Sequence, residues 1–224
     1  MLRRFIHYSA PVLANETLWG VGYSLITVIM GHMAASGDLI AAYTVAGSID
    51  KLSTAGIYGI ANAAAVIVGK EIGIGSHESV VRIGKAVCLT AFLFALALGG
   101  VELLAFFTLL RPYVLPLFSL SAGAAAMCAV MVYCYAGVMP LHGFSSTMVV
   151  GVLRGGGDVR ASLLIDNFPL WCMELPLMCL LGLVLKVPNE VFCLCIAIEH
   201  LAKTPVALWR IHGGKWVHDI TRSE

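Results

Sequence analysis

The chain carries six long apolar stretches, and short polar connections separate them. A helix needs about 20 mostly apolar residues to cross the hydrocarbon core of a bilayer. Each stretch reaches that length, so we predict an all-α membrane protein with six transmembrane helices forming one lobe over residues 1–211. The predicted spans run roughly over residues 10–33, 39–68, 84–110, 122–150, 161–185 and 190–211. Residues 212–224 are predicted to form a cytoplasmic tail.

The composition supports a membrane location and excludes several other classes of protein. Of the 224 residues, 59% are hydrophobic and 12% are charged, whereas soluble domains carry roughly 25% charged residues. The net charge is only +1, and no basic run is longer than Arg3-Arg4, so the concentrated basic surface that nucleic-acid binding needs is missing. All seven cysteines lie in apolar stretches without a CxxC pair, which favours inert thiols over a zinc or redox cofactor.

The placement of basic residues predicts the orientation of the chain, because lysine and arginine are retained on the cytoplasmic side of a membrane. If the chain starts inside, eleven basic residues fall in cytoplasmic segments and two, Arg111 and Lys186, fall outside. Lys51 lies within a span. We therefore predict a multi-pass protein of the cell membrane with both termini in the cytoplasm.

Ionisable residues inside the predicted spans are the main functional candidates, because a charge in hydrocarbon is costly unless it is paired or hydrated. Glu16 stands out, since no basic residue lies within a turn or two on its interior side. Its partner must come from another helix, from water or from a transported cation. A carboxylate in a partly dry cavity can bind a proton or exchange it for sodium as its hydration changes. Glu102 lies near the outer end of its helix and is expected to reach the lipid headgroups.

The other intramembrane charges have both functional and structural interpretations. We expect Asp50, Lys51 and Asp166 to contact the cavity or the substrate. Asp50 and Lys51 are alternatively a self-compensating couple, and Asp166 alternatively reaches the nearby cytoplasmic surface. Glu199 and Lys203 are four residues apart on the last helix, so they share a face and can neutralise one another.

The segment "GVLRGGGDVR" at residues 151–160 has two interpretations, a phosphate-binding loop or a tight turn. It follows a membrane helix instead of a strand, and it lacks the lysine of a P-loop. We therefore predict a structural loop between the fourth and fifth spans, formed by Arg154, Gly155, Gly156, Gly157 and Asp158. The glycines allow the chain to reverse, and Asp158 is expected to cap the next helix.

Enzyme chemistry has little support in the sequence. His142 with Ser145 and Ser146 offers a base and a nucleophile, but no orienting acid or oxyanion donor accompanies them. We therefore expect no catalytic residues.

Several segments in a fixed order resemble one membrane family. They are "APVLANETLWGVGYS", "GHMAASGDLIAAYTVAG", "GIANAAAVIVGKEIGIG", "GVLRGGGD", residues 171–176, "EHLAKTP" and "KWVHDITR". Together they resemble the carboxy-terminal half of a MATE (multidrug and toxic compound extrusion) transporter over nearly the whole chain. The resemblance implies an antiporter that expels organic cations in exchange for protons or sodium, with twelve spans in two six-helix lobes.

The resemblance also implies roles for individual residues. Glu16 falls on the acidic position of the family's seventh helix, which implies a proton or cation site, with sodium at Glu16 as one alternative. His142 aligns with the acid that sodium-type members carry on the tenth helix, and its imidazole favours protons instead. We expect Asn15 and His142 to shape the site of Glu16 and Asp50 to face the central cavity.

Six spans make one lobe, and three explanations for this length stay open: a fragment or split gene product, a half that needs a separate amino-terminal lobe, or a homodimer of this lobe. Two other functions also stay open. One is a transport-incompetent assembly subunit or remnant. The other is a flippase for lipid-linked substrates, which predicts a strongly cationic groove, whereas this chain has few intramembrane bases, chiefly Lys51.

Overall fold

The computed structural model describes residues 2–74, 76–214 and 216–217, with side chains from residue 9 onward, and almost all of these residues are helical. Within this part of the chain, six helices are long and apolar enough to cross a membrane. The predicted class, an all-α membrane lobe with six spans, is confirmed. The six spans are Ser9–Gly31, Ser36–Ile74, His77–Phe118, Ala122–Leu153, Val159–Val184 and Asn189–His212.

The first four spans are built from long helices, and two of them change helix type along their length. The first two spans lie in α1 (Leu2–Gly31) and α2 (Ser36–Ile74). The third span consists of α3 (His77–Ala105), the π-helical η1 (Phe106–Val114) and the 3-10 helical η2 (Leu115–Phe118). The fourth span consists of α4 (Ala122–Ser146) and the π-helical η3 (Thr147–Leu153). The third span is longer than the predicted 84–110, because η1 carries Arg111 and Pro112 inside the helix. Pro112 has no N–H to donate, and wider π-helical turns accommodate such a gap.

The last two spans are each composed of several short helical segments. The fifth runs through α5 (Val159–Pro169), η4 (Leu170–Glu174), α6 (Leu175–Cys179) and η5 (Leu180–Val184), and the sixth through α7 (Asn189–Cys193), η6 (Leu194–Ala197) and α8 (Ile198–His212). Pro169 ends α5 and Pro176 lies near the start of α6. The π-helical segment η4 lies between the two prolines, as expected where proline interrupts the hydrogen-bond ladder.

Small residues allow the helices to approach closely. A Cβ atom on Gly143 of α4 would lie 2.4 Å from the Ala95 Cβ of α3, and one on Gly151 of η3 would lie 2.8 Å from the Ala61 carbonyl oxygen of α2. Backbones this close gain dispersion contacts that larger side chains would prevent. The small-residue run from Ala55 to Gly69 on α2 therefore serves packing, as its composition suggests.

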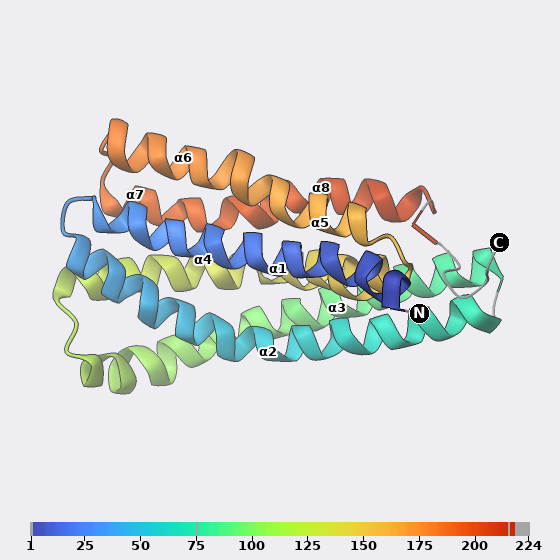
Figure 1. Cartoon of the computed structure of the whole chain (residues 1–224). Coiled ribbons are helices and arrows are strands. Elements are labelled where there is room, and N and C mark those ends of the chain that lie inside the picture. The colour runs from blue at the N-terminus through green and yellow to red at the C-terminus, as the bar shows by residue number, and fades with distance from the viewer. Residues whose placement is uncertain (1, 75, 215, 218–224) are drawn as a thin grey trace.

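The spans lie side by side along one long axis (Figure 1). Helix α3 packs against α2 and α4, while α1 contacts α2 and α5, and α8 contacts α4 and α5. Helices α1, α2, α4, α5 and α8 thus surround the middle of the bundle, where the candidate site lies.

A segment of the predicted tail belongs to the folded bundle. Trp216 is fully buried, and its ring contacts the Cα positions of Gly84 and Gly156 so closely that a Cβ on either glycine would lie within 2.9 Å of it. Nearby, the imidazole of His77 contacts the Gly214 carbonyl oxygen at 3.2 Å. The rest of the predicted tail, residues 215 and 218–224, lies outside the described residues.

Candidate functional site

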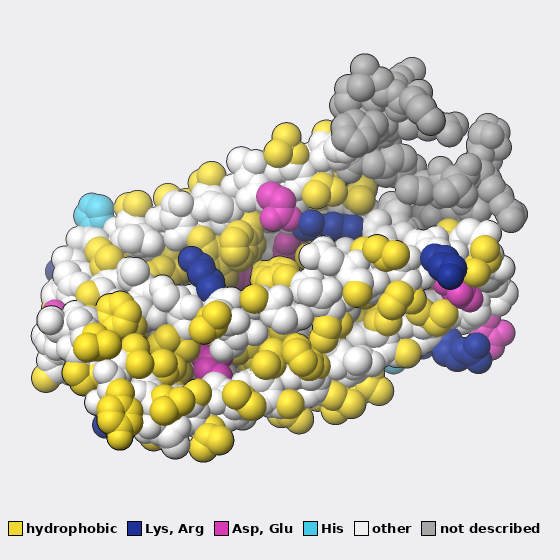
Figure 2. Space-filling model, turned by 90° about the horizontal axis from the view of Figure 1, so that it is seen from below, with side chains coloured by type: hydrophobic (Ala, Val, Ile, Leu, Met, Phe, Trp, Pro, Cys, Tyr) yellow, Lys and Arg dark blue, Asp and Glu magenta, His cyan; other side chains and the backbone are white. Residues whose placement is uncertain are grey.

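A cavity of about 690 Å³ opens among the helices. Figure 2 shows acidic and basic side chains gathered in a hollow of a face that is otherwise mostly hydrophobic and neutral. Side chains from α1, α2, α4, η3, α5 and α8 line the cavity. Such a concave site with a few convergent polar groups is the usual form of a small-molecule site.

The charges that line the cavity are unequal in number. The acidic residues are Glu16, Asp50, Asp166 and Glu199, and the basic residues are Lys51, Arg154 and Lys203. With its four carboxylates ionised and its imidazoles neutral, the lining has one more negative charge than positive charge. An apolar environment makes such an excess costly, so the cavity is suited to take up a proton or another cation.

Lys203 lies at the centre of this charge cluster. Its Nζ is 2.6 Å from Oδ1 of Asp166 and 2.7 Å from Oε1 of Glu199. The hydroxyl of Tyr23 on α1 donates a hydrogen bond of 2.8 Å to the other oxygen of Glu199. The side chains of Lys203 and Glu199 are only 4% and 1% exposed, so this group is shielded from the screening that weakens surface ion pairs.

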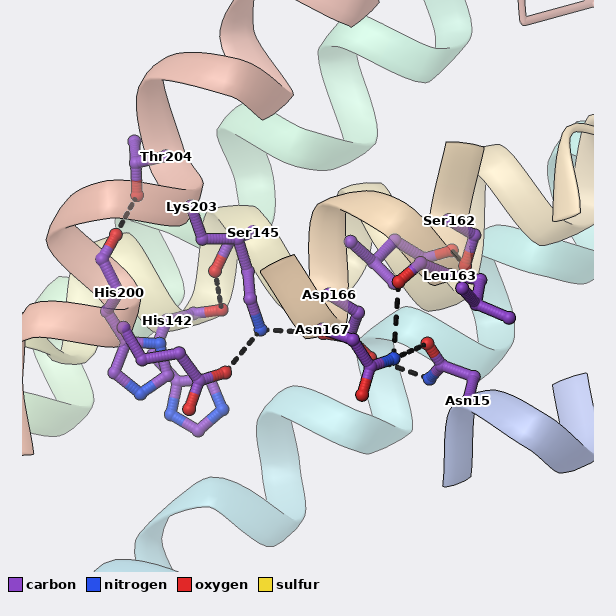
Figure 3. Close-up of polar contacts among 12 residues, drawn as sticks. Asn15, His142, Ser145, Ser162, Leu163, Asp166, Asn167, His200, Lys203 and Thr204 are labelled. Carbon is purple, nitrogen blue, oxygen red and sulfur yellow. Dashed lines mark hydrogen bonds and ion pairs between the residues drawn. The ribbon is translucent and has the colours of Figure 1, made fainter. Parts of the chain in front are cut away.

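Asp166 joins two helices besides its own. The amide of Asn15 on α1 donates to Oδ2 of Asp166 at 2.7 Å, and Asn167 donates to Oδ1 of Asn15 at 2.7 Å. Figure 3 shows Asn15, Asp166, Asn167 and Lys203 converging from three segments of the chain. Both oxygens of the Asp166 carboxylate thus have donors, which compensates for its burial.

Glu16 lies at the rim of the cavity and pairs with Arg154. The Arg154 Nη2 atom is 2.7 Å from Oε1 of Glu16 and 4.0 Å from Oδ2 of Asp166. The guanidinium also donates from Nε to the hydroxyl of Ser162 at 3.3 Å. The Glu16 side chain is 57% exposed, whereas those of Asp166 and Glu199 are 13% and 1% exposed, so the latter two carboxylates are more deeply buried than Glu16.

Two imidazoles form one wall of the cavity. The rings of His142 and His200 are stacked with centroids 4.3 Å apart and an interplanar angle of 21°, and Tyr58 meets His142 edge-on. Ser145 donates its hydroxyl to the backbone carbonyl of His142 at 3.3 Å. This serine therefore donates to the helix backbone and not to the imidazole.

The structure brings most of the predicted site residues into one cavity, but not in the predicted grouping. Glu16, Asp50, Lys51, His142 and Asp166 all line it. From the sequence we expected Asn15 and His142 to shape the site of Glu16. Instead, the amide of Asn15 contacts Asp166 and Asn167, and His142 stacks on His200.

The glycine-rich segment differs from the predicted loop at both ends. Arg154 and Gly155 are still helical, and the Arg154 side chain belongs to the cavity. The reversal occurs at Gly157, whose φ of 81° favours glycine. Asp158 stands at the N-cap position of α5 without making a side-chain cap; its carboxylate binds the guanidinium of Arg210, with Nε 2.9 Å from Oδ2.

Sequence reasoning missed several cavity residues. The spacing of Glu199 and Lys203 predicted their ion pair, which the structure confirms, but not the second partner of Lys203 on α5. His200, Tyr23 and Tyr58 were not anticipated. A sequence feature that could have indicated them is the clustering of polar and aromatic residues in otherwise apolar spans, notably the adjacent pair Glu199-His200.

Glu102 does not reach the lipid headgroups as expected. Its side chain is buried, and neither carboxylate oxygen has a hydrogen-bond partner among the described residues. The expectation failed because Glu102 occupies the face of α3 that packs toward the bundle, as do the buried Ala95 and Gly99.

Comparisons with known proteins agree with this architecture. A family profile described as MatE matches residues 11–179, whereas a search of curated proteins found no match. Among solved structures, the crystal structure of a MATE mutant shares the fold, with a TM-score of 0.76 at 20% sequence identity. The match covers 92% of this chain and 45% of that chain, so this chain spans less than half the length of the solved protein.

Proposed function

The chain belongs to the MatE family, and on this premise we propose that it is one six-helix lobe of an antiporter that exports organic cations in exchange for protons or sodium. It is a multi-pass membrane protein of the MATE superfamily of transporters. The cavity described above is the proposed path of the substrate.

One observation carries the proposal: acidic residues outnumber basic ones in a cavity walled by aromatic rings. Aromatic faces attract organic cations, and carboxylates supply the balancing charge. The aromatic residues of the wall are Trp19, Tyr23, Tyr43, Tyr58 and Tyr135. A flippase for anionic lipid-linked substrates needs a cationic groove, so the acidic excess favours a cationic substrate.

Arg154 offers a route by which the two fluxes are coupled. It pairs with Glu16 at 2.7 Å and lies 4.0 Å from Asp166. When a proton or sodium ion neutralises Glu16, Arg154 is free to move toward Asp166. There it competes with an organic cation, because both neutralise the same carboxylate. Binding of the coupling ion thus lowers the affinity for the substrate, as antiport requires.

A second six-helix lobe completes the transport path in this proposal. Alternating access needs two lobes that rock about a central site, and the chain covers 45% of the solved transporter that it resembles. An amino-terminal lobe from another chain or a second copy of this chain would fill the role. Site-specific crosslinking in native membranes distinguishes these partners.

Placement in the membrane follows the basic residues, with both termini in the cytoplasm of the cell. A fusion of alkaline phosphatase to residue 224 tests it, since this enzyme is active only outside the cytoplasm. An inactive fusion at residue 224 and an active one after Lys186 support the orientation, and the reverse pattern refutes it.

Ethidium efflux tests the transport function directly. Cells express the chain alone or with a six-helix amino-terminal lobe, and efflux is followed under an imposed proton or sodium gradient. We expect gradient-driven efflux that Glu16→Gln abolishes, because the coupling ion loses its carboxylate. Glu190→Gln is the matched control, since Glu190 is exposed and outside the cavity. Full coupled efflux by Glu16→Gln would refute the assignment of the coupling site.

A further inference from the structure

Lys203 is an unusual member of a cation-binding cavity, because it is itself a buried cation. Only 4% of its side chain is exposed, and its ammonium group lies between the carboxylates of Asp166 and Glu199 at 2.6 Å and 2.7 Å. An ammonium group has three N–H donors, and two of them are directed at these carboxylates. The resulting geometry, an ammonium held by two acids beside the hydroxyl of Tyr23, is what a protonated organic amine would find in this cavity.

The pairing has an energetic consequence. Removing one partner from a buried ion pair is strongly unfavourable, because it leaves an uncompensated charge. Asp166 and Glu199 therefore require a cation at all times. Replacing Lys203 by another cation keeps this requirement satisfied, so the exchange of one cation for the other costs far less than emptying the site.

The surroundings allow such an exchange. Lys203, Asp166 and Glu199 all line the same cavity of about 690 Å³, which is within the range of small-molecule sites. The lysine stem has four flexible carbons, so its ammonium can leave the two carboxylates without movement of the helix. His200 lies one turn before Lys203 on α8, and its ring stacks on that of His142 in the same cavity wall.

We propose that Lys203 is a tethered counter-ion that occupies the substrate site, and that the exported organic cation binds Asp166 and Glu199 by displacing it. The proposal rests on the proposed function, because it names the substrate site of that transporter. In the empty site Lys203 neutralises the two carboxylates, and in the loaded site it points into the aqueous part of the cavity. The tethered lysine keeps the empty carboxylates from binding stray protons or metal ions.

Chemical modification of wild-type protein tests the displacement. The full chain in detergent is treated with acetic anhydride, with and without tetraphenylphosphonium, an organic cation that has no reactive amine. Acetylation at Lys203 is measured by mass spectrometry relative to Lys70, which is exposed and outside the cavity. We expect Lys203 to be protected in the empty protein and to become acetylated as tetraphenylphosphonium is added. Continued protection at saturating tetraphenylphosphonium would overturn the proposal.

Equilibrium binding provides a second test. Lys203→Met removes the internal competitor, so tetraphenylphosphonium should bind about tenfold more tightly, within the usual range of coupling between two bound groups. Lys51→Met is the matched control, because Lys51 lines the same cavity but is exposed, so its charge is screened. We expect a change of about threefold or less for this variant. If both variants gain the same affinity for tetraphenylphosphonium, the effect comes from the loss of any positive charge in the cavity and not from Lys203 at the substrate site, and the proposal is overturned.

The results of these two experiments do not depend on the result of the transport assay. Both modification and binding use the isolated chain without a membrane gradient, so neither depends on a second lobe or on an ion gradient. If the cells show efflux but Lys203 stays protected from acetylation, the proposed transport function is supported and the displacement of Lys203 is refuted. If Lys203 is displaced but the cells show no efflux, the substrate site is supported and the proposed antiport is refuted.

Discussion

Arg154, directly after the fourth span, and Glu16 on the first span form an ion pair of 2.7 Å between residues 138 positions apart. The same guanidinium lies 4.0 Å from Asp166, the carboxylate that also holds Lys203. One arginine therefore connects the exposed rim of the cavity with its buried centre. This connection is the physical basis of the coupling proposed above.

Replacing Arg154 should uncouple the organic cation from the coupling ion. In the wild type we expect tetraphenylphosphonium affinity to fall about fivefold or more as the coupling ion is added, because an ion bound at Glu16 frees Arg154 to compete at Asp166. In Arg154→Gln this dependence on the coupling ion should be lost. Binding titrations at several concentrations of the coupling ion measure it. Arg160→Gln, at an exposed site, should behave as the wild type, and an unchanged dependence in Arg154→Gln would disprove the role of this arginine.

Asp166 should matter for stability as well as for binding. Asp166→Asn leaves Lys203 with one carboxylate instead of two, so the protein should lose stability, but by less than the roughly 3–5 kcal/mol that a fully unpaired buried charge costs. The double variant Asp166→Asn with Lys203→Met should lose less stability than the two single losses added together, because each single variant already loses the contact between these two side chains. Unfolding of the detergent-solubilised protein measures these values. Strict additivity would show that the two side chains do not interact energetically.

Trp216 should anchor the segment after α8 to the bundle. Its ring is fully buried against Gly84 and Gly156, so Trp216→Ala should destabilise the protein by roughly 3–5 kcal/mol. Trp209→Ala is the matched control, because Trp209 is 75% exposed. Thermal unfolding of both variants is the measurement. Similar small effects at the two positions would mean that residue 216 does not pack in solution as it does in the structure.

Gly143 should be essential for the contact between α3 and α4. No space exists there for a side chain, since a Cβ would lie 2.4 Å from that of Ala95. Gly143→Leu should lower the free energy of unfolding by about 1–3 kcal/mol, the usual cost of overpacking. Gly137→Leu on the same helix should be tolerated, because nothing lies within 4 Å of the Cβ position. The folded yield of each variant after size-exclusion chromatography is the measurement, and equal yields would contradict the prediction.

Much of the fold could be predicted from the sequence because hydrocarbon imposes a simple rule on it. Apolar length alone predicts the number of spans, and all six appear within the described residues. The end of the third span could not be predicted, because "RPYV" has the composition of a turn while π-helical turns carry it onward. Likewise, the ion pair of Arg154 with Glu16 could not be predicted, because the two residues are 138 positions apart.

The site was predicted less completely than the fold. Individual charges in apolar spans singled out Glu16, Asp50 and Asp166, because a charge there is costly without a partner, and the structure places all three on the cavity lining. The links between them depend on how helices rotate about their axes, which a single sequence does not encode in any short-range pattern. For this reason the local pair Glu199 and Lys203 was predictable, whereas the contact of Lys203 with Asp166, 37 positions away, was not.

The measurement closest to the central claim is ion release on binding of an organic cation. Purified chain in a weakly buffered solution is titrated with tetraphenylphosphonium, while the pH and the retention of radioactive sodium are recorded. Antiport predicts that binding releases protons or sodium, and that Glu16→Gln reduces this release while Glu190→Gln does not. Saturable binding with no release of either ion would contradict the proposal that substrate and coupling ion compete within this cavity.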